Sequence, residues 1–217
     1  PRINAGGRVG KCSHGANLLL DKDPKNVFQL AMELDTFNNE RKILEKNLLQ
    51  EVLKSQINTS DPVLIFSGDN WHEGIIGIIA SRVKDKYNKP VIIISINNNV
   101  GKASARSVFG YDIGSLIIRG VQEGILIKGG GHKMAGGFSI ETKKILDFKN
   151  FVMKNFKNSQ QASIQEKKIF FDSTIAPSAI NLEFLKKVEN LAPFGPGNTE
   201  PKFIVENVKT INSKIVG

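Results

Sequence analysis

The sequence predicts an α/β domain with a sheet covered by helices, preceded by one long helix and followed by the start of a β-rich module. Apolar strand-like runs alternate with amphipathic helical patterns across residues 61–157, which is typical of a sheet packed between helical layers. A stripe of apolar residues precedes this region, and a polar stretch at 158–165 follows it as an expected linker.

The long helix is expected across residues 23–58. Asp23 is a favourable N-cap, and Pro24 suits the first helical turn. From Val27 to Val52, apolar residues recur at steps of three and four, which predicts an amphipathic helix. An ordinary core helix or a connector between two domains would both carry this stripe. The Gly-rich residues 1–22 ahead of it have the pattern of the end of an earlier domain.

The elements of the two later regions follow in order along the chain. Strands are expected at 62–67, 91–96, 100–106 and 138–140, and helices at 74–87, 111–123 and 142–156. In residues 166–217, strands are expected around 168–175, 203–205 and 208–211, with a helix at 182–191. The strand at 100–106 alternates polar and small residues, so one of its faces should carry Lys102, Ser104 and Arg106.

Composition excludes several classes of protein. The 217 residues are 40% hydrophobic, which excludes a wholly disordered chain, and no apolar run reaches the ~18 residues of a membrane-spanning helix. The single cysteine, Cys12, excludes an internal disulfide framework and fits a reducing, cytoplasmic setting. The net charge is +9 and falls mainly in residues 61–157. This charge favours a polyanion such as nucleic acid, although a Lys-rich composition would also spread charge over any surface.

The most distinctive motif is KGGGHK at residues 128–133, with two further glycines at 136–137. Consecutive glycines can adopt positive φ values and form a turn whose N–H groups bind an anion. In such a turn, Gly130 and Gly131 would approach a ligand closely. His132 would donate a hydrogen bond to a phosphate oxygen or stabilise the charge of a phosphodiester transition state. The alternative is a tight turn with an incidental histidine.

Ser104 and Arg106 form a second candidate site, because a hydroxyl and a guanidinium two residues apart on a strand can clamp a phosphate. The alternative is a half-exposed strand with solvated polar residues. His72 precedes the helix expected at 74–87, where it is expected to cap the helix or line a ligand groove rather than bind a metal. Arg2 and Arg8 could grip a backbone phosphate.

Some catalytic motifs are missing from the sequence. It has no Asp-His-His and no other cluster of carboxylates and histidines dense enough for a two-metal hydrolase. It also has no Walker A loop and no GxSxG elbow.

Four segments in this order resemble one family: PRINAGGR, WHEGIIGIIASR, GKASARS and GGGHKMAGG. The combination resembles the bacterial RecJ family, whose members are single-strand-specific 5′→3′ DNA exonucleases of the DHH/DHHA1 phosphoesterase superfamily. The glycine–histidine motif alone would indicate only the superfamily. The later APFGPGNTEPKF resembles the stretch that leads into the OB-type module of the same family.

The resemblance implies a domain organisation. Residues 1–22 would end the catalytic DHH domain, 23–58 would be a connector helix, 61–157 a DHHA1 domain, and 166–217 the start of an OB-type nucleic-acid-binding domain. The family's two-metal site, with Mn²⁺ or Mg²⁺, sits on DHH residues that would lie ahead of Pro1. The chain by itself is therefore expected to bind no metal and to lack catalysis.

The resemblance also implies roles for individual residues. Ser104 and Arg106 match residues expected to hold the 5′ phosphate of the strand. Gly130, Gly131 and His132 match the motif that faces the scissile phosphate, with His132 as the candidate catalytic residue.

The implied function is the substrate-binding part of an exonuclease that acts on single-stranded DNA in repair and recombination. Arg2 and Arg8 match basic residues expected near the DNA path. Further expected partners are a helicase and a single-strand-binding protein, and no membrane is expected. Two alternatives are a phosphodiesterase of the same superfamily acting on short oligonucleotides or cyclic dinucleotides, and a purely nucleic-acid-binding module.

Overall fold

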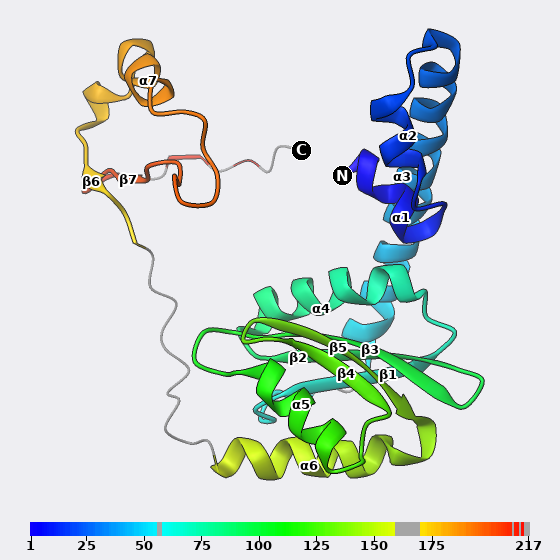
Figure 1. The fold of residues 1–217 in the computed structure, drawn as a ribbon. Coiled ribbons are helices and arrows are strands. Elements are labelled where there is room, and N and C mark those ends of the chain that lie inside the picture. The colour runs from blue at the N-terminus through cyan, green and yellow to red at the C-terminus, as the bar shows by residue number, and fades with distance from the viewer. Residues whose placement is uncertain (56–57, 159–169, 210, 213, 215–217) are drawn as a thin grey trace. The chain divides into compact units, whose positions relative to one another are not determined.

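The computed structural model describes residues 1–55, 58–158, 170–209, 211–212 and 214 (Figure 1). The chain divides into two compact units, residues 1–165 and 166–217, which are described separately. Among the described residues, no helix combines the length and the apolar character that a membrane span requires.

The first unit is built on a five-stranded mixed sheet in the order β1-β2-β3-β5-β4. The strands are β1 (Leu64–Asp69), β2 (Val91–Asn97), β3 (Val100–Arg106), β4 (Lys128–His132) and β5 (Ala135–Glu141). β1 runs parallel to β2, and the remaining neighbours pair antiparallel. β1 and β4 are therefore the two edges of the sheet.

Helices cover both faces of this sheet, as Figure 1 shows. They are α4 (Glu73–Tyr87) on one face and α5 (Ile113–Gln122) and α6 (Ile145–Asn158) on the other, with a short 3₁₀ turn at Thr142–Lys144 before α6. The side chains of β2 divide between two cores: Ile92 and Ile94 pack on the α5 and α6 side, and Val91 and Ile93 on the α4 side. This burial on both faces explains why β2 is a continuous apolar run.

The expected long helix is present as α3 (Pro24–Lys54), and the predicted α/β class is confirmed. Asp23 caps α3 by accepting a hydrogen bond from the N–H of Lys25 at 3.0 Å. Near its C-terminal end, Leu48 and Val52 pack into the core on the α4 side of the sheet. The end expected at residues 56–57 lies outside the described residues.

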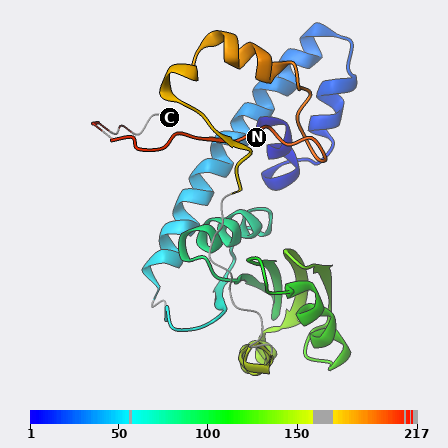
Figure 2. The same ribbon diagram turned by 90° about the vertical axis from the view of Figure 1, so that its left-hand side faces the viewer.

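Two short helices, α1 (Arg2–Val9) and α2 (His14–Leu20), pack against α3 (Figure 2). α3 is joined to α4 by the buried carboxylate of Glu45, which pairs with Arg41 at 2.6 Å on its own helix and with Arg82 of α4. α1 also contacts α4. These contacts hold the beginning of the chain beside the first turn of α4.

The second unit contains α7 (Leu182–Glu189), a 3₁₀ turn at Pro177–Ala179, and a parallel pair of two-residue strands, β6 (Ser173–Thr174) and β7 (Phe203–Ile204). The strands are shorter than the sequence predicts, and the described residues at 208–209 and 211–212 are not in a strand. An alternating pattern forms a strand only where a neighbour pairs along its length, and here the pairing spans two residues. Residues 168–169 of the expected strand lie outside the described part.

Candidate nucleic-acid interface

Three neighbouring strands form a polar surface on the α4 side of the sheet. α4 packs over β2 and β3, and α5 packs on the opposite face of β4 and β5. Along β4, Lys128 and His132 are exposed to solvent, and Gly130 between them is partly exposed. β4 and β5 therefore present one face to solvent beside α4.

The register of the strands places nine residues in three rows on this surface, which we call the open face. Directly opposed residues of antiparallel strands point to the same side of a sheet. From β3 through β5 to β4, the rows are Lys102–Ser139–Lys128, Ser104–Gly137–Gly130 and Arg106–Ala135–His132. The open face thus has a basic side chain at each corner and small residues in the middle.

The floor of the open face is bare backbone at Gly130 and Gly137. A Cβ atom added at Gly130 would meet nothing within 4 Å, and one at Gly137 would meet only the carbonyl oxygen of Ala103, at 3.2 Å. A ligand can therefore approach the peptide groups of these strands without meeting a side chain.

The triple glycine is not the anion-binding turn that the sequence predicts. Gly129, Gly130 and Gly131 lie in the extended strand β4, and none of them has a positive φ value. Glycine is needed on the other face because α5 packs closely there. A Cβ at Gly129 would lie 2.7 Å from Cγ2 of Ile117, and one at Gly136 would lie 2.5 Å from Cδ1 of the same residue.

Arg106 lies across Ser104 at one corner of the open face. Its Nη1 donates hydrogen bonds to Oγ of Ser104 at 3.1 Å and to the carbonyl oxygen of Ala105 at 2.8 Å. Burial, with a smaller contribution from the nearby charge of Arg8, lowers the pKa of Arg106. The guanidinium stays charged at neutral pH, and its half-buried position strengthens its attraction for an anion.

Gly77 of α4 provides the space for this corner, and the sequence analysis missed it. A Cβ at Gly77 would lie 3.1 Å from both Nη2 of Arg106 and Oγ of Ser104. A glycine in the middle of an apolar helical pattern was the available signal, because glycine is unfavourable there without a packing reason.

His132 stands at the opposite corner of the same row, exposed to solvent. Its Nδ1 accepts a hydrogen bond from the N–H of Met134 at 3.3 Å, so Nε2 carries the proton and can donate to a ligand. Two strand spacings separate His132 from Arg106, which is roughly 10 Å. The structure therefore brings Ser104, Arg106, Gly130 and His132 to one surface, whereas Gly131 lies on the opposite face of β4.

Two other predicted residues lie beside the open face, at the start of α4. Nδ1 of His72 accepts a hydrogen bond from the N–H of Gly74 at 3.2 Å and so caps the helix. Nη1 of Arg8 donates to the carbonyl oxygen of Gly74 at 3.4 Å. Glu73 pairs with the corner residue Lys102 at 2.8 Å. The carboxylate of Glu73 therefore partly neutralises that corner.

Arg2 is engaged elsewhere in the structure. Its Nε donates to the carboxylate of Asp35 on α3, and this hydrogen bond lowers the pKa of Asp35. The side chain of Arg2 thus ties α1 to α3 rather than serving the open face.

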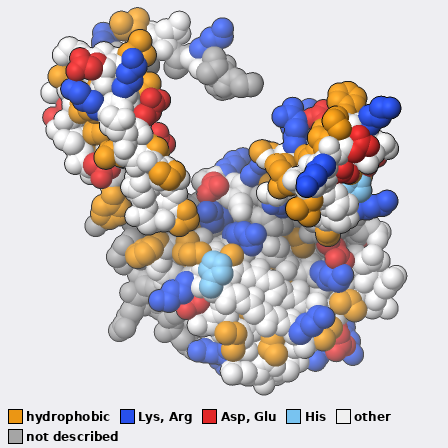
Figure 3. Space-filling model, turned by 45° about the horizontal axis from the view of Figure 1, so that its top comes forward, with side chains coloured by type: hydrophobic (Ala, Val, Ile, Leu, Met, Phe, Trp, Pro, Cys, Tyr) orange, Lys and Arg blue, Asp and Glu red, His pale blue; other side chains and the backbone are white. Residues whose placement is uncertain are grey.

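The described residues do not fit a divalent-metal site. No group of three or more His, Cys, Asp or Glu side chains in this part of the chain is arranged to hold an ion. The open face instead supplies cations, N–H donors and hydroxyls, which are the groups that bind phosphate. On the face of the molecule shown in Figure 3, Lys and Arg side chains are scattered among acidic ones.

Each of the two units matches a known domain family. Residues 60–158, which include the whole sheet, match the DHHA1 domain, and residues 171–217 match the RecJ OB domain. The chain belongs to the RecJ family.

Relatives in this family align with the full length of the chain. The single-stranded-DNA-specific exonuclease RecJ of Haemophilus influenzae is 30% identical over 227 residues, covering 100% of this chain and 39% of the relative. RecJ of Bacillus subtilis is 26% identical over 223 residues, covering 100% of the chain and 28% of the relative. The chain thus spans about two fifths, or less, of the length of these relatives.

Solved structures of RecJ share the fold. The crystal structure of RecJ from Thermus thermophilus in complex with Mn²⁺ has a TM-score of 0.81 and 26% identity, covering 94% of this chain and 30% of that one. The complex with Mg²⁺ has a TM-score of 0.78 and 26% identity, covering 93% and 31%. Divalent metals are therefore bound by members of the family.

Proposed function

We propose that this chain holds the DNA strand in a single-strand-specific exonuclease, with the open face binding the phosphates of the strand end. The relatives are named as exonucleases of this specificity. The observation that carries the proposal is the open face itself, a floor of bare backbone with Arg106, His132 and two lysines at its corners, within the DHHA1 domain.

In this proposal, Arg106 and Ser104 bind the 5′ phosphate. The guanidinium is half-buried and rests on the hydroxyl of Ser104, so it is already oriented before the ligand arrives. Pre-orientation reduces the entropy lost on binding and favours two parallel N–H···O bonds to one phosphate. Arg8 adds positive charge beside this corner.

His132 would contact a different phosphate of the same strand. Its Nε2–H can donate while Nδ1 stays occupied by the N–H of Met134. The roughly 10 Å between His132 and Arg106 separates two ligand groups rather than crowding one. Hydrogen-bond donation from His132 to the scissile phosphate would stabilise the charge that develops there during hydrolysis.

The metal ions would be held by other residues of the longer protein. When bound, Mn²⁺ or Mg²⁺ would activate water for attack on the phosphodiester. The residues of this chain would bind and orient the strand. We further propose cleavage from the 5′ end, in cytoplasmic DNA repair and recombination, with a helicase and a single-strand-binding protein as partners.

The second unit supports a long substrate over a short one. The match of residues 171–217 to the RecJ OB domain supplies a module of the type that binds extended single strands. A phosphodiesterase for cyclic dinucleotides has no need of such a module, so the exonuclease is the better supported function.

Arg106→Ala tests the role of the open face. In the full-length protein, we expect it to weaken binding of a 5′-phosphorylated oligonucleotide ~10-fold or more, because a charge-assisted bond pair is lost, and to change binding of the 5′-hydroxyl form much less. Arg119→Ala is the matched control, since Arg119 bonds to Asn155 on the α5 and α6 side of the sheet. Equal losses for the two oligonucleotides would remove the assignment.

A second experiment tests the proposal that this chain binds DNA but does not hold the metal ions. We expect the 217-residue chain to bind single-stranded DNA weakly and to leave it intact in the presence of Mn²⁺, because the metal ligands are proposed to lie elsewhere. A gel assay of a labelled oligonucleotide measures both properties, and processive digestion by this chain would contradict the proposal.

A further inference from the structure

A groove of about 500 Å³ lies between α3 and α4 in the first unit. Along α3 it is lined by residues that recur at steps of four, three and four, so they share one side of the helix. These residues are Lys42, Lys46, Leu49 and Leu53, and Arg82 lines the groove from α4. The stripe on α3 is therefore basic in its first half and apolar in its second half.

The groove carries an excess of positive charge. Its cationic lining residues are Arg41, Lys42, Lys46 and Arg82, and Glu45 is the one carboxylate among the described residues that line it. Glu45 is buried and pairs with both Arg41 and Arg82. Lys46 is exposed and forms no ion pair or hydrogen bond with another residue in the described part of the chain. Four cations against one carboxylate leave a net charge of +3 on the lining.

Two further carboxylates on the same helices are paired with cations outside the groove. The pKa of Asp35 is lowered mainly by its hydrogen bond from Arg2, and the charge of Lys42 contributes less. Asp85 of α4 pairs with Lys84 at 2.9 Å. These carboxylates therefore do not remove the positive excess of the groove.

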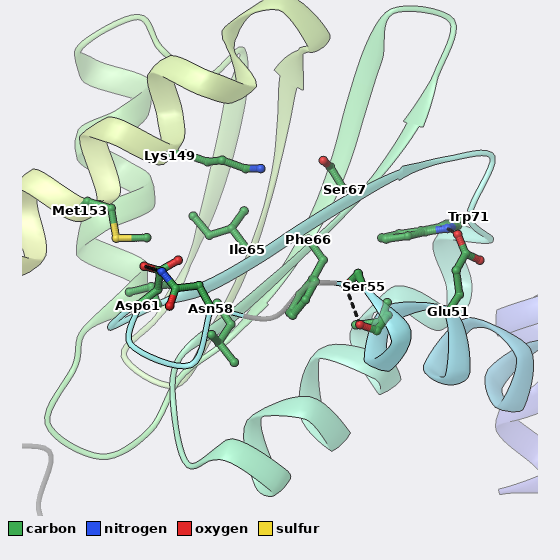
Figure 4. A pocket seen from close by; sticks show the side chains of 13 residues that line it. Glu51, Ser55, Asn58, Asp61, Ile65, Phe66, Ser67, Trp71, Lys149 and Met153 are labelled. Atoms are coloured by element: carbon green, nitrogen blue, oxygen red, sulfur yellow. Dashed lines mark hydrogen bonds between the residues drawn. The ribbon is translucent and has the colours of Figure 1, made fainter.

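This excess is not shared by the cleft that runs along β1 on the first unit. That cleft, of about 420 Å³, is lined by the carboxylates of Glu51 and Asp61 and by the ammonium group of Lys149 (Figure 4). Its acidic side chains thus outnumber its basic one. The groove between α3 and α4 has the opposite balance and attracts anions.

The lining favours an acidic peptide over a nucleic-acid strand. Grooves that bind single strands combine basic residues with aromatic side chains that stack on the bases. No aromatic residue is among the described residues that line this groove, and Leu49 and Leu53 offer half-buried aliphatic surface instead. From Lys42 to Leu53 the helix rises roughly 16 Å, which about five residues of an extended peptide would span.

We propose that this groove binds an acidic peptide segment of another protein, with carboxylates on the basic half and aliphatic side chains on the apolar half. Lys42, Lys46 and Arg82 would pair with the carboxylates. Aliphatic side chains of the peptide would pack on Leu49 and Leu53, which removes apolar surface from water. The groove shares no residue with the open face, so the proposal does not depend on DNA binding.

Charge reversal at Lys46 in the full-length protein tests the site. The probe is a fluorescein-labelled peptide, Gly-Glu-Glu-Glu-Leu-Leu-Gly, followed by fluorescence anisotropy. We expect saturable binding to the wild type and ~5-fold or more weaker binding to Lys46→Glu, because repulsion replaces attraction. Lys25→Glu is the matched control, since Lys25 is exposed on the same helix and does not line the groove. Its binding should stay within about twofold of the wild type.

Two changes in the probe test the two halves of the groove without altering the protein. A peptide with Lys in place of Glu should not bind to the wild type. A peptide with Ser in place of Leu should bind ~5-fold more weakly, because it loses the apolar contact.

Several outcomes would overturn the proposal. No saturable binding by the full-length protein, or equal weakening by Lys46→Glu and Lys25→Glu, would exclude a peptide site in this groove. Unchanged binding of the serine peptide would exclude the apolar half. Lys46→Glu is also measured with single-stranded oligo(dT), and a loss as large as that for the peptide would assign the groove to nucleic acid instead.

Discussion

The position of Gly77 in the middle of α4, directly against Ser104 and Arg106, makes Gly77→Ala a sharp test of the open face. The new methyl group would lie 3.1 Å from Nη2 of Arg106 and from Oγ of Ser104, a few tenths of an ångström too close. The guanidinium is the far end of a flexible side chain, so it should move rather than the helix. The orientation of Arg106 for a phosphate would then be lost.

Two effects of opposite sign follow, and they can be measured separately. Replacing glycine by alanine in a helix interior stabilises a helix by ~1 kcal/mol, which offsets the tight contact, so the free energy of unfolding should stay equal or rise. Binding of a 5′-phosphorylated oligonucleotide should weaken ~5-fold, since about 1 kcal/mol of a charge-assisted bond is lost. Chemical denaturation and fluorescence anisotropy measure the two quantities.

A double-mutant cycle that combines Gly77→Ala with Arg106→Ala tests this reasoning. It would be refuted if the losses of binding free energy in the two single variants add up in the double variant. Once the guanidinium is gone, the methyl group at Gly77 has nothing left to displace, so the second change should have almost no effect on binding. Additive losses would mean that Gly77 acts through another part of the protein.

Two further predictions concern the sheet and its core. Burial raises the pKa of Tyr111 to about 12, and its hydroxyl has no hydrogen-bond partner in the described residues. Folding therefore favours the neutral phenol, and the wild type should lose stability as pH rises from about 10 towards about 12. Thermal melts should show a smaller loss over this range for Tyr111→Phe. At neutral pH, the same variant should be as stable as the wild type or more stable. Gly136→Ala should destabilise the folded protein by ~2 kcal/mol, because its Cβ would lie 2.5 Å from Ile117. Gly130→Ala, whose Cβ would meet no atom, should keep the melting temperature of the wild type and weaken DNA binding. Equal melting temperatures for the two variants would contradict the packing argument.

Several elements could be predicted because their signals are local. The stripe of apolar residues and the Asp23 cap define α3 without reference to the rest of the chain. The continuous apolar run of β2 likewise indicates a strand that is buried on both faces. The alternation of β3 indicates a strand that is buried on one face. The pairing of Ser104 with Arg106 on one side of a strand follows from the period of two.

β4 could not be predicted in the same way. Glycines have no side chains to show a period, so the motif at 128–133 is compatible with a turn as well as with a strand. Its conformation is decided by the ladder with β5 and by the close packing of Ile117, both of which join distant parts of the sequence. The short strands of the second unit were overpredicted because alternation does not show where a partner strand ends.

The sequence by itself determined which residues can bind a phosphate: a serine and an arginine on one strand, and a histidine after three glycines. Only the tertiary structure decided that Arg106 and His132 share a row across three strands, and that Gly77 makes room beside them. The physical reason is that side-chain chemistry and strand periodicity are local properties. Register, close approach and burial depend on which distant segments pack together.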